Sequence, residues 1–285
     1  MWILYTFLAL LIIVALLILF VVYPGRQRDR TPFDKTLYAH RGLHSNDGKY
    51  PENSLIAFRL AREAGYGVEL DIQLTADRKV VVFHDDTLLR MCGVDCRVDE
   101  LTYEELQQYT LLGSSHRIPL LTEVLDVLDG APLLCELKPM RSYTDVTLCE
   151  IALPILKEYK GDFCVESFNP LMIRWFRKNA PEVIRGILSK KFTKEDNVAP
   201  VLGLLLGTLV TNCMTRPDFI AYLHTDCHHP MFKLCRALGA SAIGWTVKNP
   251  EEADACAAVF DTIIFEGYMA KYADKTFSEK VSKTP

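Results

Sequence analysis

The chain opens with an unbroken apolar run and then changes to a mixed pattern for the rest of its length. From Met1 to Tyr23 the only residue outside the hydrophobic set is Thr6. A helix from Trp2 to Tyr23 is about 33 Å long, which matches the roughly 30 Å hydrocarbon core of a bilayer. Trp2, Tyr5 and Tyr23 lie near its ends, where interfacial aromatic residues are common. The run over 1–23 therefore predicts one transmembrane helix.

A cleavable signal peptide is the alternative interpretation of this run. Signal peptides have a basic start, a shorter apolar stretch and a small-residue cleavage site. Here no Lys or Arg precedes the run, and it closes with Val-Val-Tyr-Pro-Gly without an A-x-A pattern. We therefore expect a retained anchor. Four positive charges follow the run: Arg26, Arg28, Arg30 and Lys35. By the positive-inside tendency, they indicate a single-pass protein whose domain is cytoplasmic.

Beyond a short polar linker at 24–36, apolar or β-branched runs alternate with helical patterns. Eight strand positions with intervening helices in about 230 residues predict a TIM (β/α)8 barrel over 37–275, followed by a polar tail at 276–285. An open doubly wound sheet is the alternative, but no G-x-G-x-x-G follows a strand. Strands are expected at 37–40, 67–74 with 78–83, 133–138, 162–166, 183–188, 218–222, 242–247 and 261–265, and helices at 54–64, 121–129, 143–158, 170–179, 197–210, 230–238 and 250–258.

Composition changes this picture little. Hydrophobic residues make up 49% of the 285 residues, and the mean hydropathy is +0.10. Without the first segment the hydrophobic share falls to about 45%, the usual level of a globular domain, which argues against a multi-span membrane protein or a disordered chain. The net charge of −4 gives no signal for nucleic-acid binding. Nine cysteines, an odd number without a framework, favour a reducing compartment.

Polar residues interrupt two of the expected central strands. In 67–74, Glu69 and Asp71 share one face while the other face is apolar. Outward residues of a barrel strand meet the helices, so the acids should face the lumen, where they could clasp a hard divalent cation at the mouth. An exposed edge strand with solvated acids is the alternative. It does not explain why 133–138 repeats the pattern, with Glu136 as a third oxygen ligand and Lys138 as a cation for an anionic substrate.

Two histidines also end expected strands. His40 closes the first strand in Ala-His-Arg-Gly, and His84 follows 78–83 in Phe-His-Asp-Asp. A lone histidine is more often structural than catalytic, but two at strand ends beside three acids fit a general acid and a general base. Arg41 adds a planar fork suited to phosphate oxygens. An anionic substrate, a hard metal, an acid and a base together suit phosphodiester cleavage.

A series of short motifs runs through the domain in the order found in a known family. With these motifs at these spacings, the chain resembles the glycerophosphodiester phosphodiesterase family from about Leu37 to Tyr268. Each motif alone is weak, and their order and spacing carry the resemblance. The motifs are AHRG (39–42), PENS (51–54), ELDIQLTAD (69–77), VVFHDDTLLR (81–90), the LT..EL stretch at 101–106, IPLLTEVL (118–125), ELK (136–138), SFN (167–169) and WTV (245–247).

The resemblance implies a TIM barrel with its site at the C-terminal mouth. In the family's usual mechanism a glycerol hydroxyl attacks phosphorus and expels the head-group alcohol, and water then opens the cyclic phosphate to give glycerol 3-phosphate. The implied residues are an acid–base pair, a set of ligands for Ca²⁺ or Mg²⁺, a group around the phosphate and a wall on the alcohol side. They are, in that order, His40 and His84; Glu69, Asp71 and Glu136; Arg41, Lys138 and Glu52; and Phe168 and Trp245.

Two departures from the family pattern concern the substrate side of the mouth. Lys248 follows Trp-Thr-Val where the family often has Asn, and Ile-Ile-Phe-Glu-Gly-Tyr at 263–268 replaces the usual Ile-Ile-Thr-Asp-x-Pro. Both put the head-group preference in doubt more than the chemistry.

Two other functions remain open beside hydrolysis of glycerophosphodiesters. One is lysophospholipase D-type cleavage of single-chain phospholipids, which the anchor and the apolar segment 198–210 favour. That segment is too short to span a bilayer, and it is either a barrel helix or an interfacial helix. The other function is a catalytically silent lipid-binding barrel, against which the intact acids and histidines argue. We expect a glycerophosphodiester or lysophospholipid substrate, the membrane as a partner through the N-terminal helix, no nucleic acid and no obligate protein partner.

Overall fold

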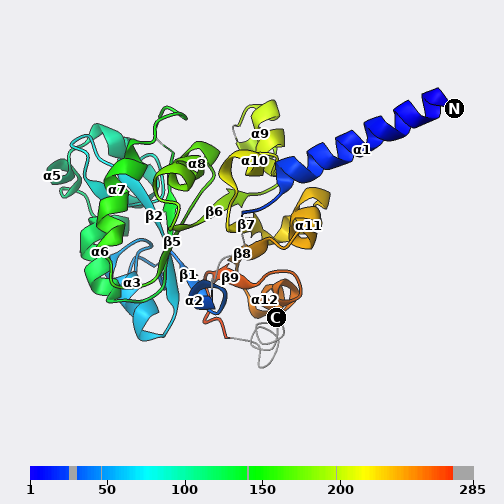
Figure 1. Ribbon diagram of the computed structural model, residues 1–285. Helices are drawn as coiled ribbons and strands as arrows, with labels where there is room; N and C mark the ends of the chain where they lie inside the picture. Colours follow the sequence, from blue (N-terminus) through cyan, green and yellow to red (C-terminus); the bar gives the residue numbers. More distant parts are fainter. Residues whose placement is uncertain (26–30, 46, 140, 197, 272–285) are drawn as a thin grey trace.

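The computed structural model describes residues 1–25, 31–45, 47–139, 141–196 and 198–271. Within them, parallel strands follow one another around a closed barrel, which confirms the predicted TIM fold (Figure 1). The barrel closes because β1 pairs with both β2 and β9. Its strands are β1 (Tyr38–His40), β2 (Gly67–Leu74), β4 (Leu133–Leu137), β5 (Phe163–Ser167), β6 (Ile184–Ser189), β7 (Phe219–Leu223), β8 (Ser241–Val247) and β9 (Thr262–Phe265).

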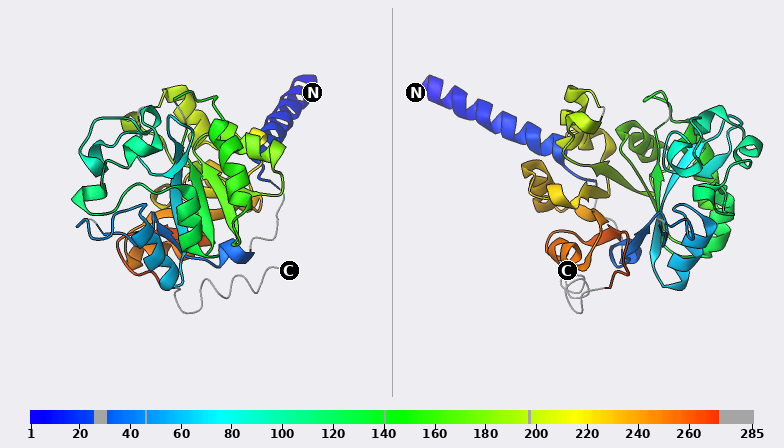
Figure 2. Two further views of the ribbon diagram at one scale, coloured as in Figure 1. Left: turned by 90° about the vertical axis from the view of Figure 1, so that its left-hand side faces the viewer. Right: turned by 180° about the vertical axis from the view of Figure 1, so that it is seen from behind.

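Helices and short turns surround the barrel (Figures 1 and 2). Polar side chains cap the start of several helices. The Ser54 hydroxyl accepts a hydrogen bond from an amide of α3. The Asn169 and Asn249 side chains do the same for α8 and α12, and both of these helices also have Pro in their first turn. The helices are α1 (Trp2–Val22), α2 (Thr31–Asp34), α3 (Leu55–Glu63), α4 (Leu89–Cys92), α5 (Tyr103–Leu106), α6 (Leu121–Leu128), α7 (Thr147–Lys157), α8 (Pro170–Asn179), α9 (Pro200–Gly207), α10 (Asn212–Thr215), α11 (Pro230–Ala237) and α12 (Pro250–Ala257).

The strand at 78–83 does not extend the barrel. Its ordered part, β3 (Val80–Val82), turns back and pairs antiparallel with β2. The chain then makes an excursion that carries α4 and α5 before α6 returns it to the barrel. This excursion has a small core of its own, which includes Met91, Leu106 and Leu111.

Two apolar layers follow from the alternation along the strands. Outward side chains such as Val68, Leu70 and Leu133 pack against the helices in the larger cluster. Inward side chains such as Leu134 and Cys164 fill the lower part of the lumen. Acidic residues replace them toward the carboxyl ends of the strands, so the mouth is polar above a packed floor.

The segment at 24–36 contributes to that floor. Within it, α2 places Phe33 in the lumen cluster beside Tyr38 and Leu134. The Tyr38 hydroxyl donates to the Phe33 carbonyl at 3.4 Å, and the Thr262 hydroxyl donates to the Thr36 carbonyl. Because Tyr38 begins β1, this contact lies at the end of the barrel opposite the mouth.

The apolar helix α1 projects away from the barrel, and its side chains are exposed along most of its length (Figures 1 and 2). It is long and apolar enough to cross a membrane, as a signal sequence near an N-terminus also can be. Its last turn is packed on the domain. Val22 is fully buried, and its carbonyl accepts from the Asn212 side chain at 3.0 Å. The Arg216 guanidinium donates to the carbonyls of Phe20 and Tyr23 at 2.8 Å each.

Candidate active site

Three carboxylates from two neighbouring strands meet in the mouth of the barrel. Glu69 and Asp71 lie two apart on β2, and the parallel register places Asp71 opposite Glu136 of β4. All three face the lumen and are buried. One oxygen of each lies within 4.8 Å of an oxygen of the other two, so the group could hold a metal ion. This is the arrangement that strand alternation predicted.

A fourth carboxylate, Glu166 of β5, lies beside them and escaped the sequence reasoning. The register places Glu166 opposite Glu136, and its Oε2 is buried without a hydrogen-bond partner. The signal was present, because Cys164 and Glu166 alternate on the inner face just as Leu134 and Glu136 do. Burial, followed by the charge of Glu136, raises the pKa of Glu166 well above its ordinary value.

The cluster carries more negative charge than the protein's own cations balance. Burial and the charges of Asp71 and Glu136 raise the pKa of Glu69 well above its ordinary value. Burial also raises the pKa of Glu136, against the opposing effect of Lys138. Burial acts in the same direction on Asp71, but Lys138 and neighbouring cations hold the pKa of this carboxyl well below its usual range. Hard oxygen donors with unbalanced negative charge suit a hard divalent cation.

The predicted cations are present, and both are paired with acids of the site. Lys138 is buried, and its ammonium lies 2.8 Å from Asp71 and 2.7 Å from Glu136. The Arg41 guanidinium donates to Glu52 at 2.7 Å and lies 3.4 Å from Asp71. Glu52 therefore holds the arginine that adjoins the cluster. The resemblance had implied only that Glu52 lies in the group around the phosphate.

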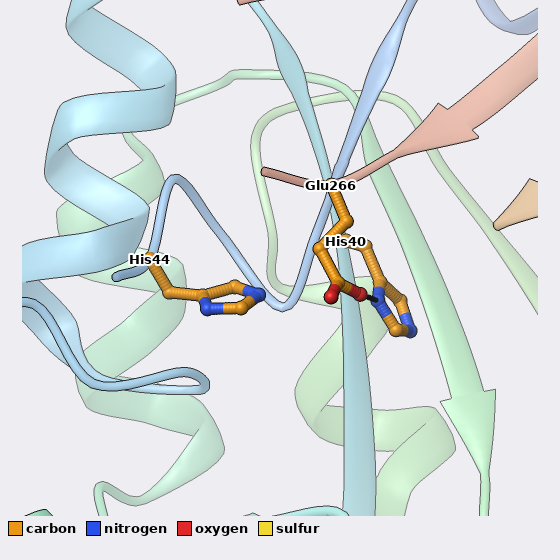
Figure 3. A group of neighbouring side chains, drawn as sticks. All are labelled: His40, His44 and Glu266. Carbon is orange, nitrogen blue, oxygen red and sulfur yellow. Dashed lines mark hydrogen bonds and ion pairs between the residues drawn. The ribbon is translucent and has the colours of Figure 1, made fainter. Parts of the chain in front are cut away.

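His40, at the end of β1, is held by a residue that follows β9, the strand that pairs with β1 to close the barrel. Its Nδ1 lies 2.6 Å from Glu266, which directly follows β9 (Figure 3). Its Nε2 lies 3.9 Å from Glu69. The hydrogen bond to His40 lowers the pKa of Glu266 to about 2, while burial lowers the pKa of His40 itself. His40 is therefore a neutral ring near pH 7, and its Nδ1–H donates to the carboxylate.

His44 stands near this pair, as Figure 3 shows. His40, His44 and Glu266 each offer an atom within 4.8 Å of the others. The Glu266 carboxylate is already engaged with His40, and imidazole ligands suit transition metals better than Ca²⁺ or Mg²⁺. The same side of the mouth contains a pocket of about 410 Å³ between segments 42–45 and 265–269. The departure at 263–268 therefore borders free space next to His40.

His84 also has a carboxylate partner, which in this case is its neighbour in the sequence. Its Nδ1 lies 2.6 Å from Asp85, and Arg90 donates to both oxygens of Asp85. Burial would raise the pKa of Asp85, but the hydrogen bonds from His84 and Arg90 hold it far below its ordinary value. Arg90 also donates to both oxygens of Glu52, which ties the His84 side of the mouth to Arg41. Sequence reasoning missed Asp85 and Arg90, although both lie in the VVFHDDTLLR motif.

Aromatic side chains form one wall of the mouth. Phe168 follows β5, and its ring meets Trp245 of β8 edge-on with centroids 5.6 Å apart. Phe192, in the segment after β6, packs edge-on against the other side of Phe168 at 6.2 Å. The predicted pair is thus one contact in a row of three rings.

The histidines offer proton transfer and the cations offer charge for an anion, beside carboxylates that fit a hard metal ion. At the carboxyl mouth of a TIM barrel this arrangement defines a class, that of metal-dependent phosphodiester hydrolases. Comparison with known proteins supplies the family.

The profile of the glycerophosphoryl diester phosphodiesterase family matches residues 40–265. A glycerophosphodiester phosphodiesterase of Caldanaerobacter subterraneus is 33% identical over 167 residues, which are 54% of this chain and 67% of that protein. The crystal structure of a glycerophosphodiester phosphodiesterase from Thermotoga maritima has a TM-score of 0.62 at 26% identity, covering 81% of this chain and 93% of that one. The chain therefore belongs to the glycerophosphoryl diester phosphodiesterase family, as the motif series predicted.

A second solved structure shows the same fold with a product bound. It is a phosphodiesterase from Oleispira antarctica in complex with sn-glycerol-3-phosphate. Its TM-score is 0.66 at 22% identity, and the similarity covers 87% of this chain and 95% of that chain. At this identity the likeness supports the fold.

Proposed function

We propose that this chain hydrolyses glycerophosphodiesters to glycerol 3-phosphate and an alcohol, with His40 and His84 as its acid–base pair. One observation carries the proposal: both histidines adjoin the same carboxylate cluster, and a carboxylate holds the Nδ1 of each. The His40 Nε2 lies 3.9 Å from Glu69, and the amide of Phe83, which directly precedes His84, donates to the Asp71 carbonyl at 2.9 Å. The two rings therefore serve one bound phosphate.

The hydrogen bonds at Nδ1 leave Nε2 of each ring for the substrate. When Nδ1–H donates to a carboxylate, Nε2 of the neutral ring has a lone pair and accepts a proton. When the ring is protonated, the same Nε2 donates, and the carboxylate stabilises the imidazolium. One ring takes the proton of the attacking glycerol hydroxyl, and the other protonates the leaving head-group oxygen. The two exchange roles when water opens the cyclic phosphate, since that step runs the proton transfers in reverse.

The acidic cluster is our proposed site for a Ca²⁺ or Mg²⁺ ion held by Glu69, Asp71 and Glu136. The fit rests on three oxygen donors within reach of one another and on the raised pKa values of Glu69 and Glu136. When bound, the ion would stabilise negative charge that develops on the phosphate. Lys138 keeps Asp71 ionised, so at least one ligand is charged before any cation arrives.

The phosphate is proposed to lie between Lys138 and Arg41, and the alcohol beside Phe168 and Trp245. Arg41 and Lys138 both approach Asp71, so their positive charges meet at one point of the mouth. Glu52 orients the Arg41 fork from behind. The aromatic wall offers apolar surface at the same rim, where it excludes water from the reacting bond.

We also propose that α1 is a retained anchor that spans the membrane, with the domain on the cytoplasmic side. A cleavable leader needs no contacts with the mature domain, whereas Val22 in the last turn of α1 is buried, and this turn is hydrogen-bonded to residues of α10 and α11 and to Arg216. No disulfide joins cysteines of the described residues, which agrees with a reducing compartment. The proposed division is an anchor at 1–23, a linker at 24–36, a barrel domain at 37–275 and a tail at 276–285, of which 272–285 lies outside the described residues.

A product assay with purified protein tests the proposal. Glycerophosphocholine, glycerophosphoethanolamine, glycerophosphoglycerol and a lysophospholipid are compared with chelator, Ca²⁺ or Mg²⁺. His40→Ala and His84→Ala are expected to lower turnover by about 10²–10⁴-fold, because each removes a proton-transfer group. His228→Ala changes an exposed histidine in the loop between β7 and α11 and serves as the matched control.

Each arm of this assay has an opposing outcome. Wild-type turnover in either site variant, with unchanged thermal unfolding, would remove that histidine from the mechanism. Full activity in chelator would exclude the metal site. Cleavage of the lysophospholipid in preference to the three water-soluble diesters would favour the lysophospholipase D alternative, and no turnover of any substrate would favour the silent barrel.

A further inference from the structure

Helix α9 has the reverse of the polarity expected for a helix at a water-exposed surface. Its small residues face inward: a Cβ added to Gly203 would lie 3.0 Å from the Phe192 Cβ, and one added to Gly207 would lie 3.0 Å from the Lys190 carbonyl oxygen. Several of its large side chains face outward, with Val201 72% and Leu204 65% exposed, while Leu206 is buried. Among the described residues beyond α1, these are the two most exposed large hydrophobic side chains.

The position of α9 relative to α1 suggests what covers this face. The last turn of α1 contacts α10 and α11, and α10 follows α9 along the chain. The views from the front and from behind both show α9, α10 and α11 on the side of the barrel from which α1 projects (Figures 1 and 2). The hydrogen bonds of Arg216 and Asn212 to the end of α1 fix this arrangement. A bilayer entered by α1 therefore begins beside α9.

The same helix is connected to the catalytic mouth. Between α9 and segment 191–194 lies a groove of about 440 Å³, and Phe192 lines it. Phe192 also packs on Phe168, which packs on Trp245. Aromatic contacts thus link the groove beside α9 to the wall of the mouth. The segment 190–196 has three lysines and two acids, a net charge of +1, at the edge of this groove.

We propose that the outer face of α9 docks in the interfacial layer of the bilayer that α1 spans, and so holds the rim of the mouth against the lipid surface. The occupant is a lipid bilayer, because the face is apolar, has a slightly basic edge and adjoins the entry point of α1. Water would leave these side chains solvated, while the interface of a bilayer removes them from water. This inference rests on the proposed anchor and does not depend on which substrate is cleaved.

Photocrosslinking of the full-length chain in vesicles tests this docking. The chain is reconstituted in phosphatidylethanolamine and phosphatidylglycerol, with the photoreactive residue p-benzoylphenylalanine (Bpa) in separate variants. Leu204→Bpa and Val201→Bpa probe α9, and Ile12→Bpa probes the anchor. Leu89→Bpa is the matched control, because Leu89 is also an exposed leucine, at 55%, but lies on α4 in the excursion after β3. Lipid adducts are identified by mass spectrometry, and hydrolysis of glycerophosphocholine is measured on the same vesicles.

Lipid adducts at 204 and 201, with only background at 89, are the expected result. Adducts at 12 but not at 204 or 201 would overturn the docking of α9 while the anchor stands. Crosslinks from 204 to a second protein chain in place of lipid would also overturn it, since another copy would then cover the face. Loss of the anchor would show as no adduct at 12, and failure of the proposed activity would show only in the hydrolysis assay.

Discussion

Lys138→Met is the substitution that most directly tests the charge balance of the mouth. The Lys138 ammonium lies between Asp71 and Glu136 at 2.8 and 2.7 Å, and its side chain is 10% exposed. Methionine fills a similar volume without the charge. The variant would therefore leave two buried carboxylates without their cation, next to the carboxylates of Glu69 and Glu166.

The size of the effect follows from the burial of the pair. Removing one partner of a buried ion pair costs about 3–5 kcal/mol of unfolding free energy. For a domain of this size each kcal/mol shifts the midpoint of thermal unfolding by about 2–4 °C, so the loss is about 6–20 °C. A divalent cation at about 100 times its Kd would return about 2.7 kcal/mol by binding the folded state.

The pH dependence of the loss has a definite sign. Burial already raises the pKa of Glu136 against the opposing effect of Lys138, so without Lys138 this pKa would rise further, and the pKa of Asp71 would rise with it. A carboxyl with a raised pKa such as Glu136 favours the folded state when it is protonated, and this contribution is lost as the pH rises through the raised folded-state pKa. Lys138→Met is therefore expected to be less destabilising relative to wild type at pH 5 than at pH 8.

Thermal unfolding of the purified variant in chelator, Ca²⁺ and Mg²⁺ at both pH values measures these quantities. Lys157→Met is the matched control: the Lys157 ammonium lies 2.7 Å from Glu182, but this pair is about half exposed. Surface pairs of this kind contribute about 0–1 kcal/mol. An equal shift in both variants, with no response to cations, would refute the reasoning that Lys138 balances a buried metal site.

Three further predictions concern the histidine partner and the anchor. Glu266→Gln is expected to lower kcat by about 10²-fold with little change in KM, because the amide no longer fixes the His40 tautomer; unchanged steady-state kinetics would contradict this role. The pKa of Glu266 is held near 2, below its ordinary 4.5, so its carboxylate stabilises the fold fully above pH 4.5 and loses this effect as the pH falls toward 2. The stability advantage of wild type over Glu266→Gln should therefore shrink as the pH falls from 4.5 toward 2, and a difference that does not change with pH would count against this role. Arg216→Met should speed amide exchange across 19–25, since it removes two hydrogen bonds to the end of α1. Arg62→Met is the control, because the Arg62 guanidinium donates to the Val127 carbonyl, far from α1.

The alternation along single strands was enough to predict that three acids meet in the lumen. Glu69 and Asp71 on one strand and Glu136 on the next each interrupt an apolar pattern at the end that parallel strands share. Any closed arrangement of such strands brings them to the same rim. Glu166 obeys the same rule and was available from the sequence, although it was not found.

The partners of these residues could not be predicted, because they depend on contacts between distant segments. Glu266 meets His40 across 226 positions, through the pairing of β1 with β9. The contact between Asn212 and Val22 spans 190 positions. Neither contact leaves a local pattern in the sequence, since a carboxylate after a strand or an asparagine in a short helix is common on any surface. The turn of β3 away from the barrel has the same origin, because its apolar run would also fit a barrel strand.

The buried end of α1 has a consequence for how a soluble form of this enzyme is made. A truncation at the end of the apolar run would remove the Val22 side chain from the core. It would also leave Asn212, Cys235 and Arg216 without the carbonyl acceptors that they use. The last turn of α1 is thus part of the folding unit of the barrel. A stable fragment therefore needs to start before Phe20 and to carry polar substitutions on the outer side of that turn.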